Sequence, residues 1–216
     1  TQTPASRPVG ASGRVDPNNW TRPERQSMSP RTSLIEPFSV QFDLAAGVML
    51  HPHAQIVRRA SDMRGYYADE QALEQLITAH HDPIHYETFE SPVPEEYGQV
   101  KFCVSRLYPG KVGDEYFMTK GHYHAVVETG EAYLGLRGQG LMLMKTAEGA
   151  CRWEAFAPGK LIYVPPYWAH RSVNTGDEPL VSLCLYPGDA GHSYGDIKSE
   201  GFPRRVFQRG GQVVVS

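Results

Sequence analysis

The sequence predicts an all-β protein whose short antiparallel strands form a sandwich or a small barrel. From Gln99 onward, roughly six to eight segments of alternating polar and apolar residues follow one another, with no long helical pattern between them. The chain contains 21 glycines and 17 prolines, and glycine-rich connections separate these segments. Such turn-forming residues favour a strand-rich protein over a helical one.

The expected strands of the second half span residues 101–108, 117–124, 131–136, 140–145, 152–155, 160–164, 170–174 and 180–186, with a last strand at 212–215. Upstream, loose alternation predicts a half-buried strand within 35–50, and residues 56–59 and 84–89 predict two more.

One short helix is expected between these upstream strands. Asp69 can cap its first turn, and Leu73, Leu76 and Ile77 form an apolar stripe along it. His80 and His81 suit its carbonyl end, where polar or cationic groups are favourable.

Residues 1–33 differ in composition from the rest of the chain. They contain Pro4, Pro8, Pro17, Pro23 and Pro30 and show no hydrophobic periodicity, so we expect a disordered extension. The predicted organisation is an extension (1–33), N-terminal strands and a short helix that pack on the barrel or on a dimer partner (34–98), and a barrel with a metal site (99–216).

The formal net charge of −3 gives no electrostatic reason to expect nucleic-acid or membrane binding. No apolar run reaches the ~18 residues of a membrane span. Cys103, Cys151 and Cys184 are widely spaced, as in proteins that keep reduced thiols, which predicts a cytoplasmic location.

Four residues of the second half have the spacing of a metal site. His122 and His124 are one residue apart, so on a strand both imidazoles share a face. Glu131 follows a probable turn at Thr129–Gly130, and His170 follows a proline-marked bend. Three imidazoles and a carboxylate suit Fe(II), Mn(II), Ni(II) or Zn(II).

These segments resemble the cupin superfamily, which implies an antiparallel jelly-roll barrel. Gly159, Pro165, His170 and Asn174 fall on the spacing of its second motif, although Tyr167 stands where glycine is usual. In the first motif either Glu128 or Glu131 fits. The strand pattern favours Glu131, because Glu128 lies at the edge of the turn.

A closer resemblance is to the cupin-type glucose-6-phosphate isomerases of archaea and some bacteria. It rests on residues 118–124, 131–133, 163–171 and 186–195, and extends weakly over 36–215. The implied reaction interconverts glucose 6-phosphate and fructose 6-phosphate in glycolysis or gluconeogenesis. It proceeds through an enediolate or by a metal-directed hydride shift.

The resemblance implies a role for each site residue. One divalent ion per subunit, with Fe(II) favoured and Mn(II), Ni(II), Co(II) or Zn(II) open, would be held by His122, His124, Glu131 and His170, and Glu131 would also carry the proton. The phosphate would contact Ser105, Thr119, Gly121, His192 and Tyr194, and the sugar chain would contact Tyr86, Tyr133 and Tyr186.

Other interpretations stay open at this point. A cupin Fe(II) dioxygenase would use a similar ligand set, and a non-catalytic sugar-phosphate-binding cupin would keep the fold. His192 can be an ordinary surface residue, and the three tyrosines ordinary core aromatics. The pair His51 and His53 is interpreted as incidental, and Lys120 is expected to face away from the site. A homodimer that pairs through residues 36–60 is expected, since edge strands invite pairing.

Overall fold

The computed structural model describes residues 32–216, so the predicted extension lies almost wholly outside the described residues. The strands are β1 (Phe42–Asp43), β2 (Val48–Met49), β3 (Ala54–Arg59), β4 (Ile84–Glu90), β5 (Val100–Leu107), β6 (Lys111–Val112), β7 (Glu115–Tyr116), β8 (Glu131–Arg137), β9 (Gly140–Lys145), β10 (Cys151–Phe156), β11 (Leu161–Val164), β12 (Ala169–Asn174), β13 (Leu180–Pro187), β14 (Val206–Arg209) and β15 (Gln212–Val215). The helices are α1 (Glu70–Ala79) and α2 (Gly195–Glu200), and a 3₁₀ turn spans Ala60–Met63.

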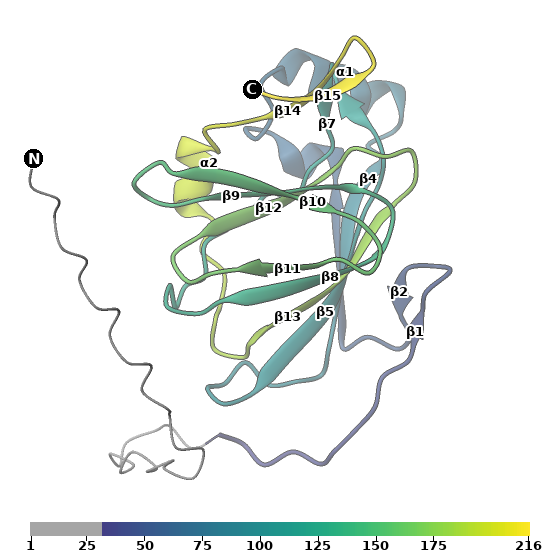
Figure 1. The fold of residues 1–216 in the computed structure, drawn as a ribbon. Coiled ribbons are helices and arrows are strands. Elements are labelled where there is room, and N and C mark those ends of the chain that lie inside the picture. The colour runs from purple at the N-terminus through teal and green to yellow at the C-terminus, as the bar shows by residue number, and fades with distance from the viewer. Residues whose placement is uncertain (1–31) are drawn as a thin grey trace, which may run out of the picture. The chain divides into compact units, whose positions relative to one another are not determined.

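Two sheets face each other and enclose the core (Figure 1). The larger sheet has the order β11-β8-β13-β5-β4-β3, and the smaller has the order β10-β9-β12. All pairings are antiparallel. The predicted all-β, antiparallel, cupin-type architecture is therefore confirmed.

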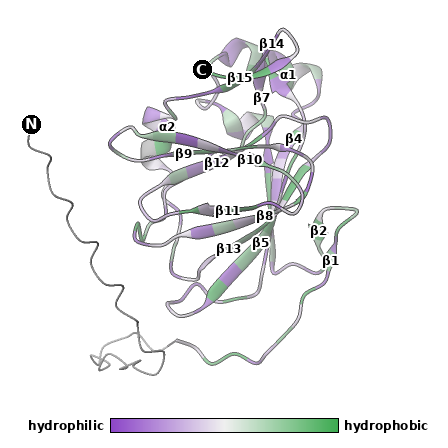
Figure 2. Ribbon diagram, viewed as in Figure 1, coloured by the Kyte–Doolittle hydropathy of each residue, from purple (hydrophilic) through white to green (hydrophobic). Residues whose placement is uncertain are grey.

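The register of the larger sheet aligns side chains from distant parts of the sequence. Glu90, Cys103, Cys184 and Tyr133 lie opposite one another along β4, β5, β13 and β8. Cross-strand neighbours of this kind have Cβ atoms about 5 Å apart and share one face. Figure 2 shows both hydrophobic and hydrophilic segments along β5.

The short helix forms as the sequence predicts. Asp69 accepts a hydrogen bond from the Ala72 amide at 2.9 Å, Leu73 is fully buried, and His80 closes the last turn. Neither helix of the described part has the length and apolar character needed to cross a bilayer.

Three expectations need correction. Residues 35–50 form only the short β1–β2 hairpin, in which Leu44 is 62% exposed, because the chain turns at Gly47 (φ +69°). Residues 117–124 pair through isolated bridges rather than as a strand. The C-terminal tail contains α2 and β14, which alternation in the sequence did not predict.

Candidate metal centre and substrate pocket

A cavity of about 640 Å³ brings the predicted site residues together. It is lined by all of the predicted residues except His124, which lines a second pocket. The lining residues are Tyr86, Ser105, Thr119, Gly121, His122, Glu131, Tyr133, His170, Tyr186, His192 and Tyr194. These residues come from β4, β5, β8, β12 and β13 and from the loops 117–124 and 188–194. One pocket thus contains three of the four residues expected to bind metal and all of those expected to bind substrate.

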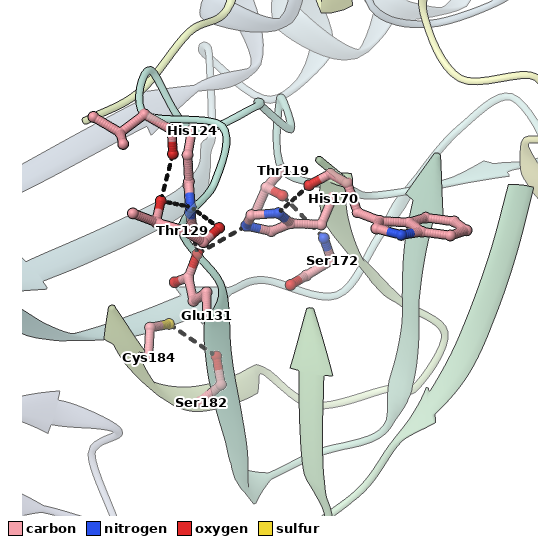
Figure 3. Close-up of polar contacts among 10 residues, drawn as sticks. Thr119, His124, Thr129, Glu131, His170, Ser172, Ser182 and Cys184 are labelled. Carbon is pink, nitrogen blue, oxygen red and sulfur yellow. Dashed lines mark hydrogen bonds and ion pairs between the residues drawn. The ribbon is translucent and has the colours of Figure 1, made fainter. Parts of the chain in front are cut away.

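At one end of this cavity, four side chains converge. His122, His124, Glu131 and His170 each offer one ligand atom, and these atoms lie within 4.8 Å of one another. The last three are buried. Figure 3 shows the rings of His124 and His170 directed at the Glu131 carboxylate from different sides. The chain path accounts for this: His122 and His170 form an isolated antiparallel bridge, and Glu131 opens β8.

The tautomer of His124 is set by Thr129. Nδ1 of His124 lies 3.0 Å from the Thr129 carbonyl oxygen and 2.8 Å from its hydroxyl. That hydroxyl donates its proton to the Val126 carbonyl, so both Thr129 oxygens accept and Nδ1 must carry the hydrogen. Nε2 of His124 therefore presents its lone pair to Glu131 Oε2, which is 3.0 Å away.

The other two imidazoles also aim at the carboxylate. Nε2 of His170 lies 3.0 Å from Glu131 Oε2, and Nε2 of His122 is buried with no hydrogen-bond partner among the described residues. Burial, and then the neighbouring His170 and His192, hold the pKa of His122 well below its usual value, which keeps this imidazole neutral. Burial would raise the pKa of Glu131, but the surrounding imidazoles hold it well below its ordinary range.

A divalent metal ion fits this arrangement. An imidazole lone pair and a carboxylate that face each other across about 3 Å repel unless a cation lies between them, and two ligands at ~2.1 Å from an ion and at right angles lie ~3 Å apart. The two short distances to Glu131 Oε2 match this spacing. The Thr129 contact supplies the outer support typical of a metal-binding histidine.

Comparison with known proteins identifies the family that the sequence motifs resemble. The glucose-6-phosphate isomerase (GPI) family model matches residues 57–216. The glucose-6-phosphate isomerase of Thermococcus gammatolerans is 51% identical over 180 residues, which cover 83% of this chain and 93% of the relative. That of Pyrococcus abyssi is 50% identical over 181 residues (83% and 94%), and that of Sinorhizobium medicae is 43% identical over 180 residues (83% and 84%). The chain belongs to the glucose-6-phosphate isomerase family.

In this glucose-6-phosphate isomerase family member, the hydroxyl and glycine residues expected to bind phosphate line the same cavity as the metal-binding cluster. The Thr119 hydroxyl oxygen accepts a hydrogen bond from the Ser172 amide at 3.1 Å, which leaves its proton for a ligand. Gly121 has φ +75°, and an added Cβ would lie 3.0 Å from the His170 carbonyl oxygen. Only glycine therefore fits where the chain passes this close to β12.

The aromatic residues lie near the metal-binding cluster. The rings of Tyr133 and His170 are 5.5 Å apart, and those of His122 and His192 are 4.5 Å apart. His192 and Tyr194 stack at 6.0 Å, and both are exposed. Burial raises the pKa of Tyr86 to about 12, so its hydroxyl stays protonated and can donate a hydrogen bond.

Lys120 does not line the cavity, as expected, because its ammonium lies over the Tyr66 ring at 5.5 Å. Glu128 is exposed and lies outside the metal-binding cluster. His53, interpreted as incidental, does line the cavity.

Sequence reasoning missed the charged residues of the cavity wall, which include Arg58, Glu90, Glu95 and Lys101. Glu90 ends β4 and Lys101 lies near the start of β5, and only the pairing of these two strands brings them to the cavity. The sequence did place Arg58 two residues after Ile56 on the predicted strand 56–59. This spacing puts both side chains on one face of the strand but indicates no function.

Proposed function

We propose that this cavity interconverts glucose 6-phosphate and fructose 6-phosphate. The observation that supports this most strongly is that the metal-binding cluster and the hydroxyl-rich side chains line a single cavity, in a chain about half identical to enzymes of that name. An aldose–ketose isomerase needs to place C1 and C2 of an open-chain sugar beside a proton carrier and to hold the distant phosphate. The metal-binding cluster suits the first task, and the hydroxyl-bearing residues of the cavity wall suit the second.

Glu131 is the proposed proton carrier between C1 and C2. It lies at the start of β8, where the imidazoles of His124 and His170 fix its carboxylate. A positioned carboxylate of this kind contributes roughly 10²–10⁴-fold to rate. Its low pKa makes it a weak base, so a hydride shift between C1 and C2 remains the competing route. In deuterated water a proton carrier would introduce deuterium at these carbons, and a hydride shift would not.

His122, His124, Glu131 and His170 would hold one divalent ion, for which Fe(II) is our first choice. When bound, such an ion supplies Lewis-acid stabilisation of negative charge on the sugar oxygens. Mn(II), Ni(II), Co(II) and Zn(II) accept the same ligands.

The phosphate group would contact Ser105, Thr119 and Gly121, together with His192 and Tyr194, whose side chains are exposed. Hydroxyls and backbone amides hold a phosphate dianion by charge-assisted hydrogen bonds. Arg58, which also lines the cavity, adds a positive charge that the sequence analysis did not place there. Tyr86, Tyr133 and Tyr186 would contact the sugar chain.

A homodimer that pairs through residues 36–60 is also proposed, together with a cytoplasmic location. β3 is an edge strand of the larger sheet, and Ile56 and Val57 are each 37% exposed on it. Exposed apolar edge strands favour pairing with a second chain. A monomeric mass by light scattering at micromolar concentration would refute the dimer.

The function is tested by incubating metal-loaded protein with glucose 6-phosphate and measuring both fructose 6-phosphate and dissolved oxygen. Fructose 6-phosphate without oxygen uptake is the expected result. Oxygen uptake with a phenolic or thiol substrate would favour the dioxygenase, and tight binding of sugar phosphate without turnover would favour a binding protein.

A further inference from the structure

The cavity contains carboxylates besides that of Glu131, and one of them, Glu90, binds one of the tyrosines. The hydroxyl of Tyr186 donates a hydrogen bond to Glu90 Oε2 at 3.1 Å. Tyr186 is 6% exposed and the Glu90 side chain 13% exposed, and both line the cavity. Tyr186 lies two residues after Cys184 on β13 and Glu131 two residues before Tyr133 on β8. Because Cys184 and Tyr133 are paired, both Tyr186 and Glu131 lie on the same side of that row.

Lys101 lies close to the carboxylates of both Glu90 and Glu95. Its ammonium lies 3.8 Å from Glu90 Oε2 and 2.5 Å from Glu95 Oε1, and the Glu95 side chain is 74% exposed. Burial raises the pKa of Glu90 above its usual value, and Lys101 and the Tyr186 hydrogen bond offset only part of that rise. An ammonium between two carboxylates favours the ionised form of both, and an ionised carboxylate only accepts hydrogen bonds.

A phenol has a single proton. Since Tyr186 gives that proton to Glu90, only its oxygen lone pairs remain for a ligand in the cavity. A sugar hydroxyl can donate to such an oxygen, but the carboxylate of a sugar acid cannot. Other donors and charges line the same cavity, among them Arg58, Lys101, Glu95, Glu131, His53 and His192, and within the described residues the Tyr186 hydroxyl is hydrogen-bonded to Glu90 and to none of these.

We propose that Glu90 is a positioning residue that fixes the Tyr186 hydroxyl as an acceptor, and that this end of the cavity thereby selects a sugar hydroxyl over a carboxylate. The inference rests on the proposed function, because it assumes that a sugar phosphate binds in this cavity. Beyond that function, the inference explains how the cavity would distinguish two sugar phosphates that differ only in the group at C1.

The test compares glucitol 6-phosphate, which has a C1 hydroxyl, with 6-phosphogluconate, which has a C1 carboxylate. Kd is measured for both by calorimetry on the full, metal-loaded chain, with metal content determined for each variant. Glu90→Met removes the acceptor at similar side-chain volume and frees the Tyr186 proton to turn into the cavity. The ratio of Kd for 6-phosphogluconate to Kd for glucitol 6-phosphate should fall by about tenfold, the size expected for one hydrogen bond to a charged group.

Two matched variants separate this effect from a general loss of charge or structure. Glu95→Met removes an equal charge from the same cluster without touching Tyr186, and it should leave the ratio within about twofold. In a Tyr186→Phe background, Glu90→Met should likewise have little effect, because the group it orients is gone.

An unchanged ratio in Glu90→Met, an equal change in Glu95→Met, or a change that persists in the Tyr186→Phe background would each overturn the inference while leaving the isomerase assignment intact. Failure of both ligands to bind the parent protein would instead count against the proposed function, and the inference would fall with it.

Discussion

Two parts of the cavity are held in place by different physical means. The floor, which consists of the cavity-lining residues of β4, β5, β8 and β13, is fixed by backbone register across one sheet. The rim, which consists of residues 117–124 and 190–194, belongs to no strand and is fixed by single contacts. The floor therefore provides precise placement for the reacting end, whereas the rim depends on a few identifiable side chains.

Hydrogen bonds from Arg171 and to Tyr67 hold residues 118–120 of the rim in place. Arg171 is buried and donates hydrogen bonds to the Lys120 carbonyl at 2.5 Å and to the Met118 sulfur at 3.0 Å. Burial lowers the pKa of Arg171 to about 10, and it remains cationic at neutral pH. The Tyr67 hydroxyl oxygen accepts a hydrogen bond from the Met118 amide at 3.3 Å and lies 2.6 Å from Nε2 of His85.

The largest expected effect comes from the floor. Glu131→Gln keeps an oxygen at the same position but removes the charge and the proton-accepting capacity. Activity should fall roughly 10²–10⁴-fold, while metal content falls much less. The measurement is kcat together with bound metal per chain, with the exposed Glu128→Gln as control. Activity equal to that of the parent would remove Glu131 from the mechanism.

A smaller effect is expected when the rim is loosened. Arg171→Met keeps the side-chain length but leaves the Lys120 carbonyl without its donor, so Thr119 and Gly121 lose their fixed position. KM for the sugar phosphate should rise about tenfold, with metal content unchanged. Arg152→Met, an exposed arginine on β10, is the control. A normal KM in the Arg171 variant would show that the rim needs no such support.

A further effect, on stability and not on activity, concerns unfolding at acid pH. Burial lowers the pKa of His85 from 6.5 to about 3. Below pH 6.5 the unfolded chain gains a proton that the folded chain does not, so stability is lost as pH falls toward the folded value, by up to about 1.4 kcal/mol per pH unit. In metal-free protein, urea unfolding of a Tyr67→Phe/His85→Phe variant should depend less steeply on pH over this range. The exposed His80→Phe is the control, and an unchanged slope would contradict the assignment of His85.

The same division explains what could be predicted from sequence. Alternation located β8 (131–136 predicted, Glu131–Arg137 observed) and β9 within a residue, because strands with one buried face show it in sequence. It failed for 35–50, where Val40 and Phe42 pack on a satellite cluster without forming a long strand. It also treated 117–124 as a strand, although bridges to Val173, His170 and Ser193 hold that segment.

The site was predictable where a motif lay in one or two short segments, as for His122, His124 and Glu131. Glu90 and Lys101 were not, because their meeting with Tyr186 depends on sheet register between segments far apart in the chain. Arg171 gave no signal of its own, since its partners are a backbone carbonyl and a sulfur.

The most direct test of the account is a metal titration of the parent protein and His170→Ala, in which fructose 6-phosphate formation is measured at each metal occupancy. After chelation the parent should be inactive, and its activity should return in proportion to bound divalent ion up to one per chain. The His170 variant should bind weakly and stay inactive at the same added concentration. Full activity in the chelated parent, or in a variant that holds no metal, would contradict a metal-dependent isomerase at this cavity.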